Sequence, residues 1–128
     1  MPATKPNFEI IQPSKKSTNN NDIDKTIGIT LRSLGVSPRH KGYYYLKIAL
    51  KMCYENPTDY NIFITKRLYP DIAAMYKIKP AGVERAIRYA ISDIVCEDSI
   101  KEEIIGYVSD RYSNGEFIAC VLEYLKCL

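Results

Sequence analysis

The sequence has no tryptophan, a single histidine, and no apolar run that approaches the ~20 residues of a membrane span. With only His40 available, a metal site or a catalytic triad built on imidazole lacks partners. The four cysteines form no CxxC pair, so a zinc site is not expected either. They are Cys53, Cys96, Cys120 and Cys127. We therefore expect no metal, no cofactor and no membrane-spanning helix.

The motifs of an enzyme are also missing. No glycine-rich loop of the phosphate-cradling type occurs, and no nucleophile stands in a motif with a base. The first residues lack the apolar segment of a secretory signal. Cys53 and Cys120 fall on apolar helical faces, where free thiols behave as small buried hydrophobic groups, as is usual in a reducing compartment. We expect a cytoplasmic protein without catalytic residues.

Helical periodicity is what the sequence does contain. No alternating stretch rich in valine and isoleucine is bounded by turns, so we expect an all-α chain. The predicted architecture is a compact bundle of about six helices that contains a helix-turn-helix. Residues 1–21 are dominated by Pro, Ser, Thr, Asn and Lys and predict a disordered polar tail. Residues 22–128 are then a single domain.

Capping and turn signals place the outer helices. The first helix is expected to start at Asp22 or Asp24 and to end near Leu34, before Gly35. Further helices are expected at about 41–55, at 62–68 after a turn at 56–59, and in one or two turns around 100–108 that Gly106 interrupts. A capping box, Ser113 to Glu116, opens the last helix. The turns around 100–108 are indicated by Ile100, Ile104, Ile105 and Val108. The residues expected to face inward are Leu46, Ala49, Leu50, Cys53, Phe117, Ile118, Val121, Leu122 and Leu125.

The stretch from Tyr69 to Ile94 predicts two helices joined by a tight turn. Pro70 and Pro80 suit first-turn positions, and Pro80 also forces Lys79 out of the helical region. A small residue, Ala73, stands where the two helices should touch. The apolar residues expected to hold the crossing are Ile72, Tyr76, Ile78, Val83 and Ala86. Many such units carry glycine in the turn, where a positive φ is cheap, so Lys77-Ile78-Lys79 predicts a different turn geometry.

The second helix of this unit, from about Pro80 to Ile94, has two unlike faces. Its apolar stripe consists of Val83, Ala86, Ile87, Ala90, Ile91 and Ile94, at helical spacing. Its other side carries Glu84, Arg85 and Arg88, which stack on one face. A short helix, a turn and an amphipathic helix with arginines near its start is the pattern of a DNA-binding helix-turn-helix.

Charge is distributed unevenly along the chain. Residues 1–90 contain 15 Lys and Arg against 7 Asp and Glu, a balance of +8, whereas residues 91–128 contain 3 against 8, a balance of −5. A basic body suits contact with phosphates, because each neutralised phosphate releases counterions. The expected flanking or backbone contacts to DNA are Arg39, His40, Lys41, Lys66, Arg67, Lys79 and Tyr89.

Two other interpretations stay open. A helix with one apolar and one charged face is also the ordinary surface helix of a globular protein. The chain could then be a helical protein-interaction module that uses the Tyr43-Tyr44-Tyr45 stretch or the acidic end, although a tyrosine cluster at helical spacing usually packs in or beside the core. Steep salt dependence of DNA binding would exclude this alternative.

A series of short motifs then carries a family resemblance. The motifs are Leu34-Gly35-Val36, Lys41-Gly42-Tyr43, Tyr45-Leu46, Ile64-Thr65-Lys66, Leu68-Tyr69-Pro70-Asp71-Ile72-Ala73, Val83-Glu84-Arg85-Ala86-Ile87-Arg88 and Glu116-Phe117-Ile118-Ala119. In this order, over about residues 23–125, they resemble the C-terminal effector domain of the stage-zero sporulation protein A family of response regulators. LYPDIA and VERAIR are the most specific of them.

The resemblance implies a six-helix fold that binds double-stranded DNA through the helix opened by Pro80. In the family, the Glu and the first Arg of VERAIR read base edges in the major groove and the second Arg lies close to the DNA. Carried over, these are Glu84, Arg85 and Arg88. The chemistry agrees, because Arg can donate to guanine O6 and N7 and a carboxylate can accept from cytosine N4. The resemblance also implies transcription regulation, tandem binding of two copies on DNA, and a nucleoid-associated place in the bacterial cytoplasm.

The sequence departs from the family at several points. Ala81-Gly82 stands in place of a Ser-Arg pair, Tyr89 in place of a His, and Pro38-Arg39 in place of Ala-His, so we expect an altered or relaxed target sequence. The segment that contacts an RNA polymerase sigma factor in the family is shorter and acidic here (residues 96–103), which leaves the sigma factor as a partner by resemblance alone. The family's phosphorylated receiver domain does not fit in 21 polar residues. We therefore expect a stand-alone effector whose binding follows its concentration, the alternative being a fragment of a longer chain.

Overall fold

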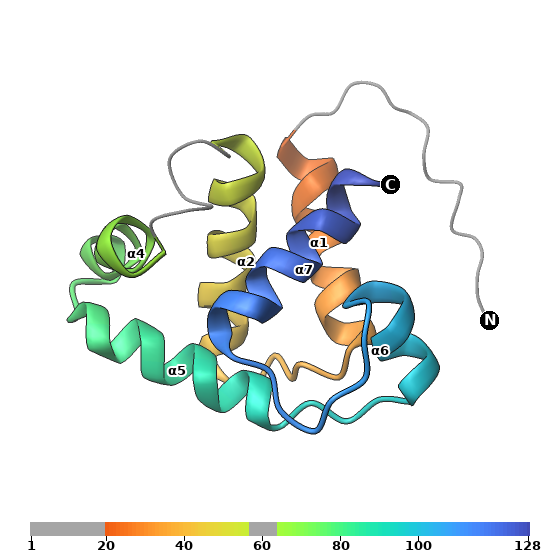
Figure 1. Cartoon of the computed structure of the whole chain (residues 1–128). Helices are drawn as coiled ribbons and strands as arrows, with labels where there is room; N and C mark the ends of the chain where they lie inside the picture. Colours follow the sequence, from red (N-terminus) through yellow and green to blue (C-terminus); the bar gives the residue numbers. More distant parts are fainter. Residues whose placement is uncertain (1–19, 57–63) are drawn as a thin grey trace.

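The computed structural model describes residues 20–56 and 64–128, and every regular element in these two ranges is helical (Figure 1). The elements are α1 (Asn20–Ser33), α2 (Lys41–Glu55), the π-helical turn η2 (Ile64–Leu68), α4 (Tyr69–Tyr76), α5 (Pro80–Ser92), α6 (Asp98–Ile104) and α7 (Asn114–Lys126). The predicted all-α class is confirmed, with six α-helices in the described ranges. The turn signal at 57–59 and the first two residues of the helix expected at 62–68 lie outside them.

Helix α2 is the centre of the packing. It contacts α1, α4, α5 and α7, and it runs through the middle of the molecule (Figure 1). Its predicted inner residues are buried with no exposed surface: Leu46, Ala49, Leu50 and Cys53. Burying a large aliphatic side chain stabilises a fold by about 1.5–3 kcal/mol, so this one face accounts for much of the core. The predicted inner face of α7, from Phe117 to Leu125, is buried against the same core.

Helices α2 and α5 approach each other closely at Gly42. A β-carbon built on Gly42 would lie 2.1 Å from the carbonyl oxygen of Ala86 and 2.8 Å from the β-carbon of Ala90. Any side chain at position 42 would therefore push the two helix backbones apart. Glycine at this position determines how deeply α5 sits against α2.

Helix α1 differs from the prediction at its start and agrees with it at its end. It begins at Asn20, so the last two residues of the expected tail are helical. Asp22 lies in the first turn, where the negative charge of a carboxylate interacts favourably with the helix dipole. Residues 1–19 lie outside the described residues. At the other end Gly35 has φ +89°, and the amide of Val36 donates to the carbonyl oxygen of Leu31 at 2.9 Å. This is the predicted glycine C-cap.

The turn between α4 and α5 corrects a prediction. Lys77 itself adopts the left-handed conformation, with φ 57° and ψ 44°, and the amide of Ile78 donates to the carbonyl oxygen of Ala73 at 3.0 Å. The geometry is thus the one that glycine usually supplies, held here by a lysine at a cost of about 1–2 kcal/mol. The turn also carries Ile78 away from the core.

The apolar residues of the α4–α5 crossing are only partly as predicted. Ile72, Ala73 and Val83 are buried. Tyr76 and Ile78 were expected to hold the crossing, but they are 43% and 40% exposed, which makes this prediction wrong for both. The ring of Tyr76 instead packs edge-on against Tyr45 of α2, with centroids 5.0 Å apart.

The region after α5 also differs from expectation. Helix α5 ends at Ser92, two residues early, where the Ser92 hydroxyl donates to the carbonyl oxygen of Tyr89 at 2.8 Å and competes with the helix. Helix α6 begins at Asp98, two residues before the turns expected around 100–108. Ile104 and Ile105 are buried, whereas Val108 lies beyond Gly106 and is 46% exposed.

Candidate nucleic-acid interface

Helix α5 lies at the edge of the molecule and separates its two faces cleanly. Val83, Ile87, Ala90 and Ile91 are buried, and Ala86 and Ile94 pack against the same core. The opposite side carries the predicted polar residues, with Arg85, Arg88 and Tyr89 exposed and Glu84 partly exposed. The helix can therefore enter a groove of a partner without uncovering core residues. A DNA major groove, about 12 Å wide, accepts one α-helix.

Glu84 and Arg88 contact each other one turn apart. A guanidinium nitrogen of Arg88 donates to the two carboxylate oxygens of Glu84 at 2.6 and 2.5 Å. The hydrogen bond to Glu84 raises the pKa of the Arg88 guanidinium above its ordinary value, so Arg88 keeps its charge. The guanidinium carbon also lies 5.9 Å from the centre of the Tyr89 ring, within cation–π range. The predicted base-contact residues Glu84 and Arg88 are thus brought together as a pair.

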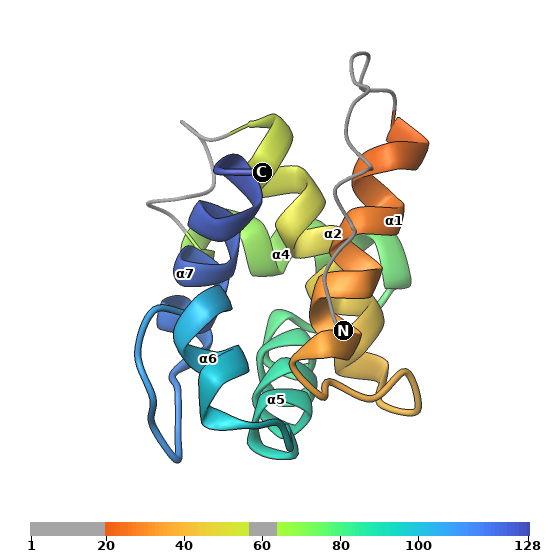
Figure 2. The same ribbon diagram turned by 90° about the vertical axis from the view of Figure 1, so that its right-hand side faces the viewer.

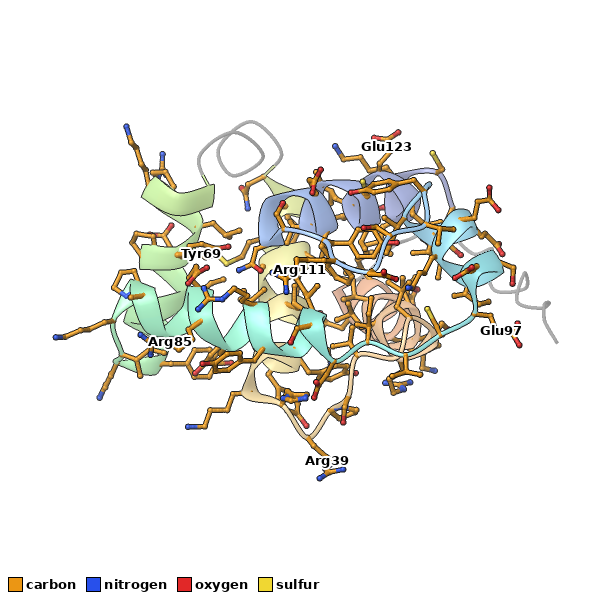
Figure 3. All side chains as sticks on the ribbon, turned by 60° about the horizontal axis from the view of Figure 1, so that its bottom comes forward. Arg39, Tyr69, Arg85, Glu97, Arg111 and Glu123 are labelled. Atoms are coloured by element: carbon orange, nitrogen blue, oxygen red, sulfur yellow. The ribbon has the colours of Figure 1, made fainter. Side chains whose placement is uncertain are left out.

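Arg85 differs from its two neighbours on this face. It is exposed, and no ion pair joins it to another residue in the described ranges. Figure 3 shows it on the outer side of α5, near the end that follows the turn. An arginine in this position presents its fork of donors to whatever α5 contacts.

The loop before α2 and the first residue of α2 lie beside α5 and hold three of the predicted flanking residues. Arg39 and Lys41 are exposed, and Arg39 projects away from the protein (Figure 3). His40 is directed elsewhere: its Nε2 lies 2.8 Å from the Oδ2 of Asp93, just past the end of α5. This contact ties the loop to α5. The Nε2 atom of His40 is thus occupied by a contact that links the segment carrying Arg39 and Lys41 to the end of α5.

The remaining predicted flanking residues lie around α4. Lys66 and Arg67 are exposed in η2, and Lys79 is exposed with the extended backbone (φ −86°, ψ 149°) predicted ahead of Pro80. Lys77 is exposed in the same turn. The cations therefore continue from the start of α5 into the preceding turns.

Arg111 was not predicted from the sequence. It is exposed on the loop between α6 and α7, and Figure 3 shows Arg39 and Arg111 on opposite sides of α5. Figure 2 shows the same order, with the α6–α7 loop, α5 and the α1–α2 loop in a row along one edge of the molecule. No motif marks an isolated loop arginine, so only the packing of α6 and α7 reveals its position.

The loop that carries Arg111 is braced from inside. The buried hydroxyl of Tyr112 donates to the carbonyl oxygen of Tyr107 at 2.7 Å and accepts from the amide of Ser109 at 3.1 Å. The ammonium group of Lys101 donates to the carbonyl oxygen of Ser109 at 3.0 Å. The Ser109 hydroxyl bonds to both the amide and the carbonyl of Arg111. Such a loop holds its arginine at a defined place.

Asn114 is the second residue that sequence reasoning missed. It is buried at the start of α7, and its side-chain amide donates to the hydroxyl of Tyr69 at 3.1 Å and to the carbonyl oxygen of Glu84 at 3.0 Å. Three helices thus meet at one side chain. Its place in the capping box predicts helix initiation but not these contacts.

Other sites receive little support from the described residues. In these ranges no group of three or more His, Cys, Asp or Glu is arranged to hold a metal ion, and no helix is long and apolar enough to cross a membrane. Of the three consecutive tyrosines, Tyr43 and Tyr45 are buried and only Tyr44 is exposed, at 48%. Tyr44 lines a shallow groove of about 270 Å³ between α1, α2 and α4. Lys51 in that groove is already paired with Asp24 at 3.3 Å.

Comparison with known protein families identifies the family of this chain. A family model described as "Sporulation initiation factor Spo0A C terminal" matches residues 27–125, which include every described helix from the middle of α1 almost to the end of α7. The chain belongs to this family. The Spo0A C-terminal family is a regulatory DNA-binding domain of a sporulation transcription factor. The resemblance inferred from the short motifs is confirmed. Family membership thus indicates that the chain binds DNA.

Proposed function

We propose that this chain is a sequence-specific transcription regulator that binds double-stranded DNA with α5 in the major groove. The observation that carries the proposal is the outer face of α5, where an exposed Arg85, free of any ion pair within the described ranges, stands beside the Glu84–Arg88 pair in a member of a DNA-binding family. A guanidinium fork that donates to guanine O6 and N7 is the commonest specific protein–DNA contact. Arg85 is assigned this role.

Glu84 and Arg88 act as one unit in this proposal. Arg88 already donates to both carboxylate oxygens of Glu84, so a cytosine amino group can donate to the carboxylate only from the side away from Arg88. The positive charge of Arg88 also keeps the carboxylate from repelling phosphates. The pair therefore restricts which bases are accepted at its position. Tyr89, stacked beside Arg88, borders the same surface.

The backbone contacts come from both sides of α5. Arg39 and Lys41 on one loop and Arg111 on the other reach the two phosphate backbones that border a major groove, and Lys66, Arg67 and Lys79 extend the contact beyond the turn. Phosphate contacts position a protein on DNA, whereas base contacts specify the sequence. His40 acts through its contact with Asp93 by holding the first loop.

All of these residues lie in one six-helix unit, between Arg39 and Arg111. We infer that the chain binds DNA in proportion to its concentration and without a phosphorylation step, as a bacterial cytoplasmic protein on the nucleoid. Two copies in tandem on repeated boxes, and an RNA polymerase sigma factor at the acidic α6, are further partners that the family resemblance suggests. Glu97 of this acidic segment lies at the far end of the molecule from Arg85 (Figure 3).

Selection of binding sites from a pool of random duplexes, with the purified chain, tests this function. We expect one short motif to emerge, with Kd unchanged by a phosphodonor and steeply dependent on salt. Band shifts on duplexes with one and two boxes would show whether copies bind in tandem. A pool that yields no motif, together with weak and salt-insensitive binding, would instead favour a helical protein-interaction module that has kept the fold.

A further inference from the structure

A single buried amide holds α5 at the point where DNA contact is proposed. Thr30 and Asn114 are the two buried polar side chains found in the described ranges. The hydroxyl of Thr30 donates within its own helix, to the carbonyl oxygen of Thr26 at 2.8 Å. Asn114 bonds only between helices, from α7 to Tyr69 of α4 and to Glu84 of α5. Buried polar groups of this kind specify one arrangement of the elements that they join.

The chemistry of the partners fixes how the amide is oriented. The carbonyl oxygen of Glu84 can only accept, so the NH2 group of Asn114 must face it. The second hydrogen of the same group meets the hydroxyl of Tyr69 at 3.1 Å. Tyr69 is 5% exposed, and burial raises the pKa of its hydroxyl, which therefore stays neutral and accepts this bond. Both hydrogens of the amide are thus used.

Asn114 is itself held firmly. The preceding residue, Ser113, forms the N-terminal capping box of α7: its hydroxyl accepts from the amide of Glu116, and the carboxylate of Glu116 accepts from the amide of Ser113. The buried face of α7 then packs against α2 and α5. The amide consequently extends from a fixed platform to the backbone of Glu84, whose side chain lies on the proposed DNA-contacting face.

We propose that Asn114 is a positioning residue for sequence recognition, because it sets the height and rotation of α5 against α4 and α7. This inference rests on the proposed function. Base-reading side chains must be held within about 0.5 Å of their productive geometry. Movement of Glu84 along or around the axis of α5 would shift Arg85 and Arg88 with it, whereas phosphate contacts are made on a duplex of any sequence. Loss of the amide therefore lowers affinity for the correct sequence and leaves non-specific affinity unchanged.

The test uses Asn114→Leu, which keeps the shape of the side chain and removes both donors. The double variant Tyr69→Phe with Asn114→Leu also removes the hydroxyl left without a partner, so it regains stability without regaining the contact to Glu84. A core variant on α1, Ile27→Val, controls for general destabilisation. Kd is measured for the selected duplex and for a scrambled duplex at a temperature where every variant is folded.

We expect Asn114→Leu and the double variant to lose about five-fold or more in the ratio of specific to non-specific affinity, the equivalent of one net hydrogen bond. Ile27→Val should keep the wild-type ratio. If Asn114 only stabilised the fold, the double variant would regain the wild-type ratio of specific to non-specific affinity together with its melting temperature. That result would overturn the proposal.

Hydrogen exchange provides a readout that does not involve DNA. In Asn114→Leu, exchange should speed up more for the amides of residues 83–88 than for those of α2. In Ile27→Val, this difference between the two segments should be smaller. Equal changes in both helices would overturn the positioning role even where wild-type protein selects a motif. If wild-type protein selects no motif, the proposed function fails and the recognition role of Asn114 fails with it, whatever the exchange shows.

Discussion

One guanidinium nitrogen of Arg88 lies 2.6 Å from one carboxylate oxygen of Glu84 and 2.5 Å from the other. The pair converts two charges on the outer face of α5 into a nearly neutral unit. Arg85 is then the cation on this face that no described ion pair compensates. The carboxylate also holds Arg88 away from phosphates, so the pair adds little affinity for a duplex that lacks the base contacted by Glu84.

Replacing Glu84 with Gln should therefore weaken discrimination. The change frees Arg88 to bind phosphates, so affinity for a scrambled duplex should rise while affinity for the selected duplex falls or stays level. Fluorescence anisotropy with both duplexes measures the two Kd values. Glu123→Gln is the matched control, because it removes the same charge from α7, at a distance from α5 (Figure 3). Equal effects of the two substitutions would show that only net charge matters.

Arg39 and Arg111 should contribute to affinity without contributing to specificity. Each lies beside α5, on opposite sides. Neutralising either one with Gln should lower affinity equally for the selected and the scrambled duplex. The slope of log Kobs against log salt should also become shallower by about 0.9 for each phosphate that is no longer neutralised. Lys126→Gln, near the C-terminus, controls for overall charge. A slope unchanged in Arg111→Gln would remove Arg111 from the interface.

Gly42→Ala should destabilise the fold and displace α5. The added β-carbon would lie 2.1 Å from the carbonyl oxygen of Ala86, so two helix backbones must separate. Overpacking of this kind costs about 1–3 kcal/mol, measurable as a lower midpoint of urea denaturation. Gly115→Ala is the control, since nothing lies within 4 Å of its β-carbon position in α7 and alanine favours a helix. Similar midpoints for the two variants would contradict the close approach of α2 and α5.

The buried thiol of Cys53 should make stability fall at high pH. Burial raises its pKa from 9.0 to about 11. The folded chain thus holds this proton to a higher pH than the unfolded chain does, so the stabilisation is fully present below about pH 9 and is lost as the pH rises toward 11.

Alkylation with iodoacetamide, followed by mass spectrometry, should modify the exposed Cys127 in folded protein and Cys53 only on unfolding. Equal rates for both would contradict the buried thiol.

Periodicity and caps were sufficient to predict most of the fold. The apolar stripes of α2, α5 and α7 face the core, and Gly35 and Ser113 mark helix ends through local chemistry that a sequence displays. Lys77 could not be predicted in this way, because lysine rarely adopts a positive φ and only the packing of α4 against α5 imposes it. The exposure of Ile78, the residue after Lys77, accompanies that turn.

In the candidate site, too, the sequence predicted the residues placed by helical spacing and missed those placed by tertiary packing. Arg85 and the Glu84–Arg88 pair follow from helical spacing, since residues four apart meet on one face. Arg111 and Asn114 depend on how α6 and α7 return to α5, more than 20 residues later in the chain, and no local pattern encodes that return. The contact of His40 with Asp93, 53 residues away in the sequence, also had no local signal, and a phosphate contact by His40 stays a prediction.

The most direct test of base reading by Arg85 replaces each guanine of the selected duplex in turn with 7-deazaguanine. This analogue keeps Watson–Crick pairing and lacks the N7 acceptor to which a guanidinium donates. Loss of a good bidentate pairing costs about 1–3 kcal/mol. We predict that one such replacement weakens binding of the wild-type chain by about five-fold or more and leaves Arg85→Ala unaffected, with Lys79→Ala as a control that keeps the sensitivity. A wild-type chain indifferent to every replacement, or an Arg85→Ala variant that stays sensitive, would contradict the reading of DNA by α5.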